Sequence, residues 1–88
     1  MTVPQLASIV ADDFNSTIES EGFSGFTEMI RYYNWTQSDV CNEICDTIND
    51  LGSEYQYWCD EDGNIYHDFD MLCSYRDFKR LLMSKVID

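Results

Sequence analysis

The sequence predicts a single small α+β domain with the order helix, helix, helix, strand, strand, helix. Three observations support this prediction: apolar residues recur at helical spacing in four segments, two aromatic and β-branched runs flank an Asp-Gly step, and 88 residues suffice for one hydrophobic core. The hydrophobic fraction of 44% and the thirteen aromatic residues exclude a disordered acidic tail. We therefore expect residues 1–88 to fold as one domain.

Two helices are predicted in the first part of the chain. Thr2 is a suitable N-cap and Gln5 occupies the capping-box position, so a helix is expected over residues 2–20. Gly22 and Gly25 indicate a turn, and a shorter helix is expected over residues 26–34. The inward residues of the two helices are Leu6, Ile9, Val10, Phe14 and Ile18 in the first, and Phe26, Met29, Ile30 and Tyr33 in the second.

Residues 36–51 give the clearest helical pattern. Thr36 is the expected N-cap with Asp39 three residues later, and Gly52 is expected to end the helix in the left-handed conformation. The apolar stripe that should face the core consists of Val40, Cys41, Ile44, Cys45, Ile48 and Leu51. Carboxylates recur at the same spacing on the opposite side, at Asp39, Glu43, Asp46 and Asp50. Because no Lys or Arg lies between residues 32 and 75, no local base neutralises these acids.

A β-hairpin and a last helix are predicted after residue 52. Residues 55–59 and 65–69 are the expected strands, joined by an acidic turn that contains an Asp-Gly step. The face that should pack against the helices pairs Cys59 with Ile65, Tyr57 with His67 and Tyr55 with Phe69, leaving Gln56, Trp58, Tyr66 and Asp68 on the other face. Ser74 and Asp77 mark the start of the last helix. Its inward residues are Tyr75, Phe78, Leu81, Leu82 and Val86.

The formal net charge of −12 is unevenly distributed. Residues 1–74 hold fifteen of the seventeen acids and only one of the five bases, whereas the other four bases are Arg76, Lys79, Arg80 and Lys85. Self-repulsion at this density destabilises a compact state, so the acidic surface suggests a role beyond folding. It disfavours a nucleic-acid or anionic membrane partner and favours a basic protein surface. The N-terminal residues contain neither a basic region nor a long apolar run, so we expect no signal peptide and no membrane span. We therefore expect a cytoplasmic location.

Two motif-level hypotheses fail on residue type. The predicted element order is that of a winged helix-turn-helix domain, but the recognition helix and the wing carry acids where DNA binding requires bases. Residues 60–65 resemble a calcium-binding loop. Alignment on Gly63, however, puts Trp58 and Phe69 at the first and twelfth ligand positions, where carboxylates are needed. A hairpin turn is the better interpretation.

Metal binding and catalysis are also disfavoured. The spacing of the four cysteines and His67 fits no zinc motif, and cysteine on an apolar stripe usually acts as a small buried residue. No phosphate loop or nucleophile motif is present in the sequence. We therefore expect that the protein is not an enzyme and that it binds neither a cofactor nor a metal. The thiols of Cys41, Cys45, Cys59 and Cys73 should be reduced. His67 is expected to be a partly buried cross-strand partner of an aromatic residue.

The acidic residues from Asp12 to Asp70, in a small and aromatic-rich chain, resemble phage-borne anti-CRISPR and anti-restriction proteins as a class, many of which occupy DNA sites on their targets. The four acids of residues 39–50 provide one charge per roughly 5 Å of helix, against about 3.4 Å per phosphate along one DNA strand. The resemblance implies a non-enzymatic DNA mimic that binds the basic nucleic-acid-binding surface of a nuclease or CRISPR effector in the host cytoplasm. The expected partner-binding residues are Asp39, Glu43, Asp46, Asp50, Asp60, Glu61 and Asp62, with Trp58 and Tyr66 as aromatic anchors.

Two other hypotheses remain open. One is an acidic protein-interaction or adaptor module whose target is unrelated to DNA, and the other is a small metal-binding domain. The oligomeric state, monomer or homodimer, is also open, as is the identity of the target.

Overall fold

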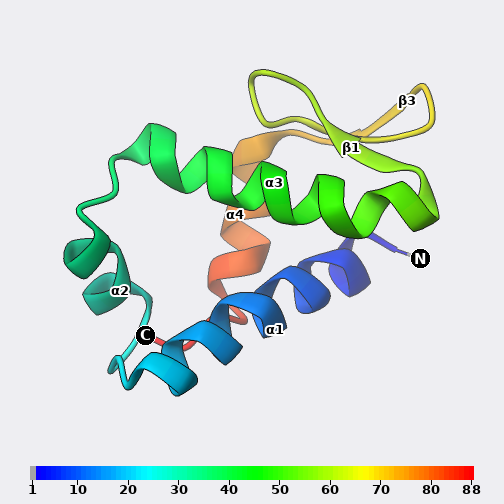
Figure 1. The fold of residues 1–88 in the computed structure, drawn as a ribbon. Coiled ribbons are helices and arrows are strands. Elements are labelled where there is room, and N and C mark those ends of the chain that lie inside the picture. Colours follow the sequence, from blue (N-terminus) through cyan, green and yellow to red (C-terminus); the bar gives the residue numbers. More distant parts are fainter. Residues whose placement is uncertain (1) are drawn as a thin grey trace.

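The computed structural model describes residues 2–88, apart from the side chains of residues 52, 53 and 55. These residues form four helices and a three-stranded antiparallel sheet, which confirms the α+β class. The elements are α1 (Val3–Glu21), α2 (Phe26–Tyr33), α3 (Gln37–Tyr55), β1 (Tyr57–Cys59), β2 (Ile65–His67), β3 (Asp70–Cys73) and α4 (Tyr75–Met83). In Figure 1 the sheet lies along one side of α3, α1 lies along the other side, and α4 passes behind α3.

α1 begins and ends as predicted. The backbone N–H of Gln5 donates to the Thr2 hydroxyl at 3.3 Å, and the Thr2 N–H donates to Gln5 Oε1 at 2.7 Å, which completes a capping box. Gly22 ends the helix with φ of 76°, a conformation that a side chain would strain. The buried face of the helix consists of Leu6, Ala7, Val10, Ala11, Phe14 and Ile18.

α2 is held in place by the last residues of the chain. The backbone N–H of Phe26 donates to the Ile87 carbonyl at 2.8 Å, and that of Thr27 donates to the Asp88 carboxylate at 2.9 Å. The backbones approach so closely here that a Cβ on Gly25 would lie 2.7 Å from the Asp88 Cα. Glycine at position 25 therefore permits a contact that joins α2 to the C-terminal segment.

α3 begins as predicted but ends at Tyr55 instead of Leu51. The Thr36 N–H donates to the Asp39 carboxylate at 2.8 Å, and the Asp39 N–H donates to the Thr36 hydroxyl at 3.2 Å. The expected stop at Gly52 is wrong, because the helix runs through that residue and the left-handed conformation falls on Gln56, with φ of 65°. A glycine inside a helix costs only about 1 kcal/mol, so packing of the helix outweighs the local preference.

The predicted hairpin is part of a larger sheet. β1 and β2 pair antiparallel with Cys59 opposite Ile65 and Tyr57 opposite His67, which confirms the predicted register. The run 65–69 is not one strand, because Asp68 adopts φ of 53° and turns the chain. β3 then returns beside β2 as a third strand that the sequence pattern does not predict.

This turn corrects the expected position of two aromatic residues. Residue 55 belongs to α3, so its pairing with Phe69 is wrong, and its side chain lies outside the described part of the chain. Phe69 is not packed on the helices but is 96% exposed, in the turn between β2 and β3.

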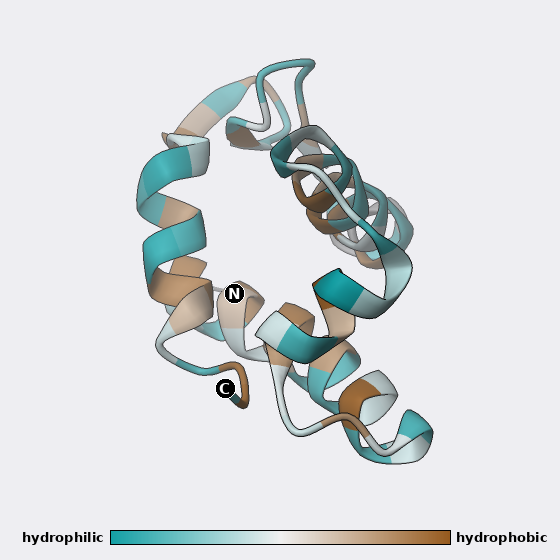
Figure 2. Ribbon diagram, turned by 90° about the vertical axis from the view of Figure 1, so that its left-hand side faces the viewer, coloured by the Kyte–Doolittle hydropathy of each residue, from teal (hydrophilic) through white to brown (hydrophobic). Residues whose placement is uncertain are grey.

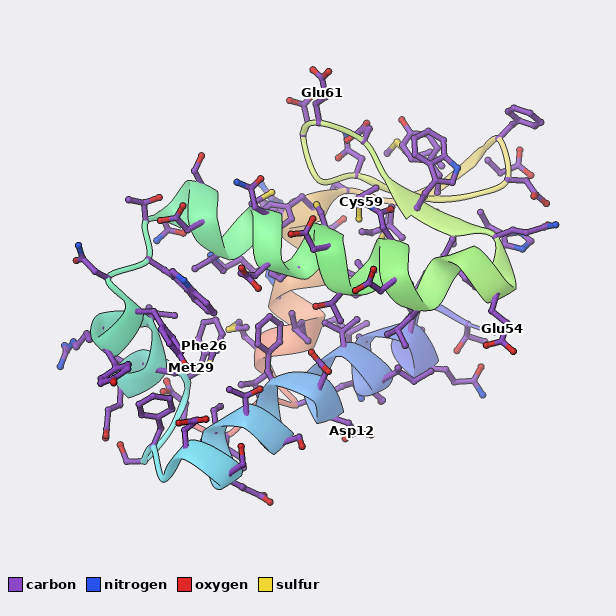
Figure 3. The ribbon with its side chains drawn as sticks, viewed as in Figure 1. Asp12, Phe26, Met29, Glu54, Cys59 and Glu61 are labelled. Atoms are coloured by element: carbon purple, nitrogen blue, oxygen red, sulfur yellow. The ribbon has the colours of Figure 1, made fainter. Side chains whose placement is uncertain are left out.

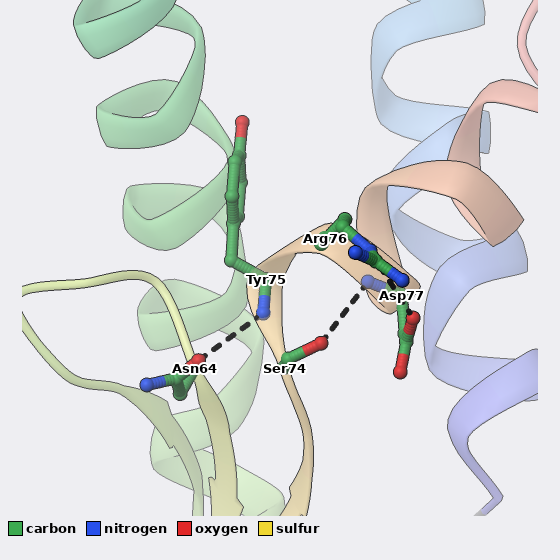
Figure 4. A network of polar contacts seen from close by, with 5 residues as sticks. All are labelled: Asn64, Ser74, Tyr75, Arg76 and Asp77. Atoms are coloured by element: carbon green, nitrogen blue, oxygen red, sulfur yellow. Dashed lines mark hydrogen bonds and ion pairs between the residues drawn. The ribbon is translucent and has the colours of Figure 1, made fainter.

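α4 completes the core. The Asp77 N–H donates to the Ser74 hydroxyl at 3.2 Å, which confirms the predicted N-cap (Figure 4). Phe78 and Leu82 of α4 are buried, and so is Val86 in the segment that follows it. Figure 2 shows α3 nearly end on, with its hydrophobic segments toward the inside of the molecule. Besides Val86, the core residues outside α1 and α4 are Phe26, Met29, Val40, Ile44, Ile48, Tyr57 and Ile65 (Phe26 and Met29 are labelled in Figure 3).

Candidate functional site

Four carboxylates lie on one face of α3, and we call Asp39, Glu43, Asp46 and Asp50 the acidic strip. At roughly 100° per residue they fall within about 60° of one another around the helix axis, and they span about 16 Å along it. Val40, Ile44 and Ile48 of the same helix are buried, so the strip lies opposite the core. α3 contains no Lys or Arg, and the strip therefore has no counter-charge on its own helix.

The members of the acidic strip differ in their exposure. Asp46 and Asp50 are exposed, whereas Asp39 and Glu43 are half-buried. Asp39 also accepts the Thr36 N–H, so one of its carboxylate oxygens is engaged in the helix cap. The strip consequently presents its most exposed carboxylates toward the C-terminal half of α3.

The turn between β1 and β2 carries three further acids, and Asp60 organises it. The Asp60 carboxylate accepts the backbone N–H groups of Asp62 and Asn64 at 3.0 and 2.9 Å, the Asn64 amide at 3.2 Å and the Tyr66 hydroxyl at 3.1 Å. Desolvation raises the pKa of Asp60, but these hydrogen bonds outweigh it and leave the pKa below its ordinary value. Asp60 therefore shapes the turn, while Glu61 and Asp62 are the exposed charges at its tip (Figure 3).

The predicted aromatic anchors lie together on the outer face of the sheet. The rings of Trp58 and Tyr66, which are directly opposite each other on β1 and β2, stack with centroids 4.3 Å apart and an angle of 11° between planes. Trp58 is 39% exposed, so the stack is accessible to a partner.

The β1–β2 turn also joins α3 to α4. A Cβ on Gly63 would lie 2.8 Å from the Tyr75 ring and 2.9 Å from the Cys41 sulfur. The backbone N–H of Tyr75 donates to Asn64 Oδ1 at 3.3 Å, as Figure 4 shows. The turn thus packs on the side of α3 that carries Cys41, which at about 100° per residue points away from the acidic strip.

α4 carries the basic residues along a shallow cleft of about 440 Å³. The cleft is lined by Tyr75, Arg76, Lys79, Arg80 and Met83. Lys79 Nζ donates to Gln37 Oε1 at 2.9 Å and lies 6.0 Å from the centroid of the Tyr75 ring, so this base connects α4 to the start of α3. The bases are recognisable in the sequence, but the cleft is not.

Three of the thiols gather between α3 and β1. Cys41 and Cys45 come from one side of α3 and interact with Cys59 of β1, which Figure 3 shows between the sheet and the helix. Burial raises the pKa of Cys45 to about 11, and burial together with the neighbouring Cys45 raises the pKa of Cys59 further. Within the described part of the chain, no three His, Cys, Asp or Glu side chains are grouped so that they could hold a metal ion.

His67 is part of the inner face of the sheet, and its ring lies 4.9 Å from that of its cross-strand partner Tyr57. The side chain is half-buried, which confirms the expected aromatic pairing. Its ring also lies 3.9 Å from the carboxylate of the neighbouring Asp68. Neither of these contacts resembles a nucleophile paired with a base.

Two exposed aromatic features are not evident from the sequence. One is a cluster around α2, in which Tyr32 contacts Phe23 and Tyr33, and Tyr33 stacks on Trp35 with centroids 5.2 Å apart. The other is Phe69 with the exposed Met71 beside it on β3. The prediction that Tyr33 faces the core is wrong, since Tyr33 is 41% exposed. Phe69 was also expected to face the helices, but the turn at Asp68 moves it away from them.

No protein-family model, curated protein or solved structure matches the chain. No helix formed by residues 2–88 combines the length and apolar character needed to cross a membrane. Function must therefore be inferred from the geometry and charge of the surfaces described above.

Proposed function

We propose that the protein is a non-enzymatic inhibitor whose acidic strip occupies the basic nucleic-acid-binding groove of a target protein. The proposed target is a nuclease or a CRISPR effector, in the cytoplasm of a cell infected by a phage that encodes the inhibitor. The observation that carries the proposal is the alignment of four carboxylates over about 16 Å of a helix that contains no base.

Such a strip would act through the forces that attract DNA to the groove. Acids at about 5 Å intervals present a charge density close to that of one phosphate strand, at about 3.4 Å per phosphate. The field of a protein with net charge −12 would also accelerate encounter with a cationic surface, and salt would weaken that effect. Glu61 and Asp62 would add to the negative field of the protein from the sheet side of α3, away from the acidic strip, whereas Asp60 would contribute mainly through the shape of the turn.

The test is a displacement assay with labelled duplex DNA bound to each member of a panel of purified restriction endonucleases and CRISPR effector nucleases. The test variant combines Glu43→Gln, Asp46→Asn and Asp50→Asn, which removes three charges and retains the Asp39 cap. We expect the native protein to displace DNA from its target, and the variant to lose about tenfold in potency, since charges at an interface speed association with an oppositely charged surface.

The matched control combines Asp12→Asn, Asp13→Asn and Glu19→Gln, three exposed acids of α1. It removes the same net charge from a different helix, so it should displace DNA nearly as well as the native protein. Equal losses in the two variants would indicate a net-charge effect without a defined site. Displacement that neither variant alters, or that is absent across the panel, contradicts the proposal.

One observation favours the alternative of an adaptor module unrelated to DNA. The aromatic cluster of Phe23, Tyr32, Tyr33 and Trp35 lies on α2 and its flanks, and Tyr32 is 72% exposed. A partner that binds there, with affinity lost on Tyr32→Ser and unchanged in the α3 variant, would identify the adaptor function.

A further inference from the structure

The outer face of the sheet carries a row of large apolar side chains. Trp58 of β1 is opposite Tyr66 of β2, and Tyr66 is opposite Met71 of β3, so the three lie side by side across the sheet. Met71 is 57% exposed, and Phe69, which is 96% exposed, lies two residues before it in the β2–β3 turn. We call Trp58, Tyr66, Phe69 and Met71 the outer-face patch.

Two of the three aromatic side chains of the patch, Trp58 and Tyr66, are fixed by hydrogen bonds as well as by stacking. The Trp58 Nε1–H donates to the Asp68 carbonyl at 2.6 Å, and the Tyr66 hydroxyl donates to the Asp60 carboxylate at 3.1 Å. A rigid aromatic surface loses little conformational freedom on binding, which is why such residues are frequent anchors in interfaces. These hydrogen bonds therefore prepare the patch for contact.

Acids border the patch at both ends, and this determines what can cover it. Asp60 and Asp62 lie in one turn of the sheet, and Asp68 and Asp70 lie in or beside the other. Residues 32–75 contain no Lys or Arg, so the sheet supplies no counter-charge. A second copy of the chain or an anionic membrane would bring like charges together at this border, whereas a cationic protein surface would complement it.

We infer that the outer-face patch is a second contact surface for a protein that has an apolar pocket bordered by Arg or Lys. Phe69 enters the pocket, and the Trp58–Tyr66 stack packs against the pocket border, where an Arg side chain gains a cation–π contact. The inference deepens the proposed function and rests on it in one respect, since the pocket belongs to the same target as the basic groove.

The first experiment does not require the target. The probe is a synthetic amphipathic helical peptide of Leu and Lys, and the control peptide has Ser in place of every Leu. We expect the Leu/Lys peptide to shift the NMR signals of the Trp58 indole N–H and the Met71 methyl group, and the Ser/Lys peptide to bind much more weakly. The Phe69→Ser and Met71→Ser double variant should lose about tenfold in affinity for the Leu/Lys peptide, because one or two anchors dominate such contacts.

Tyr32→Ser is the matched control, since it also removes an exposed aromatic ring and should leave peptide affinity unchanged. Shifts confined to α3 or α4, or affinity that the double variant does not alter, would overturn the inference. Two further results would also overturn the inference. One is a dimer, seen in sedimentation equilibrium, that the double variant does not form. The other is binding to phosphatidylglycerol vesicles that the double variant loses. Circular dichroism should confirm that the double variant is folded, as expected for substitutions at exposed sites.

The outcome separates the two proposals. If the Glu43→Gln, Asp46→Asn and Asp50→Asn variant still shows the peptide shifts at the patch while no member of the nuclease panel is inhibited, the DNA-mimic function fails and the patch remains an interface. If DNA displacement depends on the acidic strip but is unchanged by the Phe69→Ser and Met71→Ser double variant, the patch is not used and the DNA-mimic function stands.

Discussion

α3 and α4 are built alike and charged oppositely. Each has a hydroxyl N-cap with an Asp three residues later, and each buries an apolar stripe in the same core. On their polar sides, α3 carries the acidic strip without a base, whereas α4 carries three bases with Asp77 as its one acid. Because caps and apolar stripes suffice for folding, the segregation of charge between the two helices needs another explanation.

The helix dipoles strengthen this point. α4 has an acid in its first turn and a base in its last, which is the favourable arrangement at both ends. α3 has Asp39 in its first turn but no base in its last turn, where Glu54 lies instead (Figure 3). An acid near a helix C-terminus is unfavourable by a few tenths of a kcal/mol. The charge of α3 thus opposes helix stability slightly, as expected if it is kept for binding.

The β1–β2 turn connects the two helices, and substitution of its central glycine should have the largest effect on stability. Gly63→Val would force a β-branched residue into φ of 84° and press its Cβ against Tyr75 and Cys41. Strain of about 1–3 kcal/mol and overpacking of about 1–3 kcal/mol should together lower the melting temperature by more than about 10 °C. Calorimetry of the purified variant measures this shift.

Gly22→Val is the matched control, since Gly22 has φ of 76° and no atom within 4 Å of its added Cβ. Gly22→Val should be destabilised only by the backbone strain, without overpacking, so its melting temperature should be well above that of Gly63→Val. Equal melting temperatures would show that the turn does not press on α3 and α4, and that the link between the acidic and basic helices lies elsewhere.

The same turn shows what a sequence can and cannot predict. The pairing of Cys59 with Ile65 followed from alternation and from the Asp-Gly step, both of which are local signals. The sequence pattern does not predict β3, because its residues Asp70, Met71, Leu72 and Cys73 include no β-branched or aromatic side chain of the kind that marks a strand. Its formation depends on the left-handed turn at Asp68 and on the free edge of β2, and neither is visible in a local pattern.

The candidate surfaces also differ in how far local sequence patterns predict them. Helical spacing predicted that the acidic strip would share one face, since that depends only on α3 being helical. The outer-face patch depends on the register of three strands and on the exposure of Phe69. The sequence pattern therefore predicts the outward positions of Trp58 and Tyr66, but it places Phe69 wrongly in the core. Spacing also cannot predict that the Asp60 carboxylate accepts hydrogen bonds from Asn64 and Tyr66, because only the folded hairpin brings these donors to it.

Alkaline pH should weaken the contact between α3 and the sheet, with a smaller effect than Gly63→Val. Burial raises the pKa of Cys45 from its ordinary 9.0 to about 11, and it raises the pKa of Tyr75 to about 12. The unfolded chain releases the Cys45 proton above about pH 9 and the Tyr75 proton above about pH 10, in each case before the folded chain does. The stability that these groups contribute is therefore fully present below about pH 9 and declines as the pH rises toward 11 and 12. We expect a fall of several degrees in melting temperature between pH 8 and pH 10.5.

The Cys45→Ser variant provides the control for this titration, because serine does not ionise in that range. Its melting temperature at pH 8 will differ from that of the native protein, but its decline with pH should be shallower. A decline of identical slope would assign the pH dependence to other groups and remove the thiols from the contact between α3 and β1.

The smallest expected effect concerns α4, where two substitutions distinguish a specific side-chain contact from a general contribution of positive charge. Lys79→Met and Arg76→Met each remove one cation from the same helix, so they change the net charge of the protein equally. Lys79 donates to Gln37 of α3 at 2.9 Å, whereas the Arg76 side chain is 82% exposed and its ion pair with Asp77 is 4.0 Å long. We expect Lys79→Met to destabilise the protein by about 0.5–1 kcal/mol and Arg76→Met by less than about 0.5 kcal/mol. Chemical denaturation at low and high salt decides between two explanations. A larger loss of unfolding free energy for Lys79→Met at both salt concentrations indicates a specific contact between α4 and α3. Equal losses for the two variants that high salt abolishes indicate that α4 acts only as a counter-charge to the acidic strip.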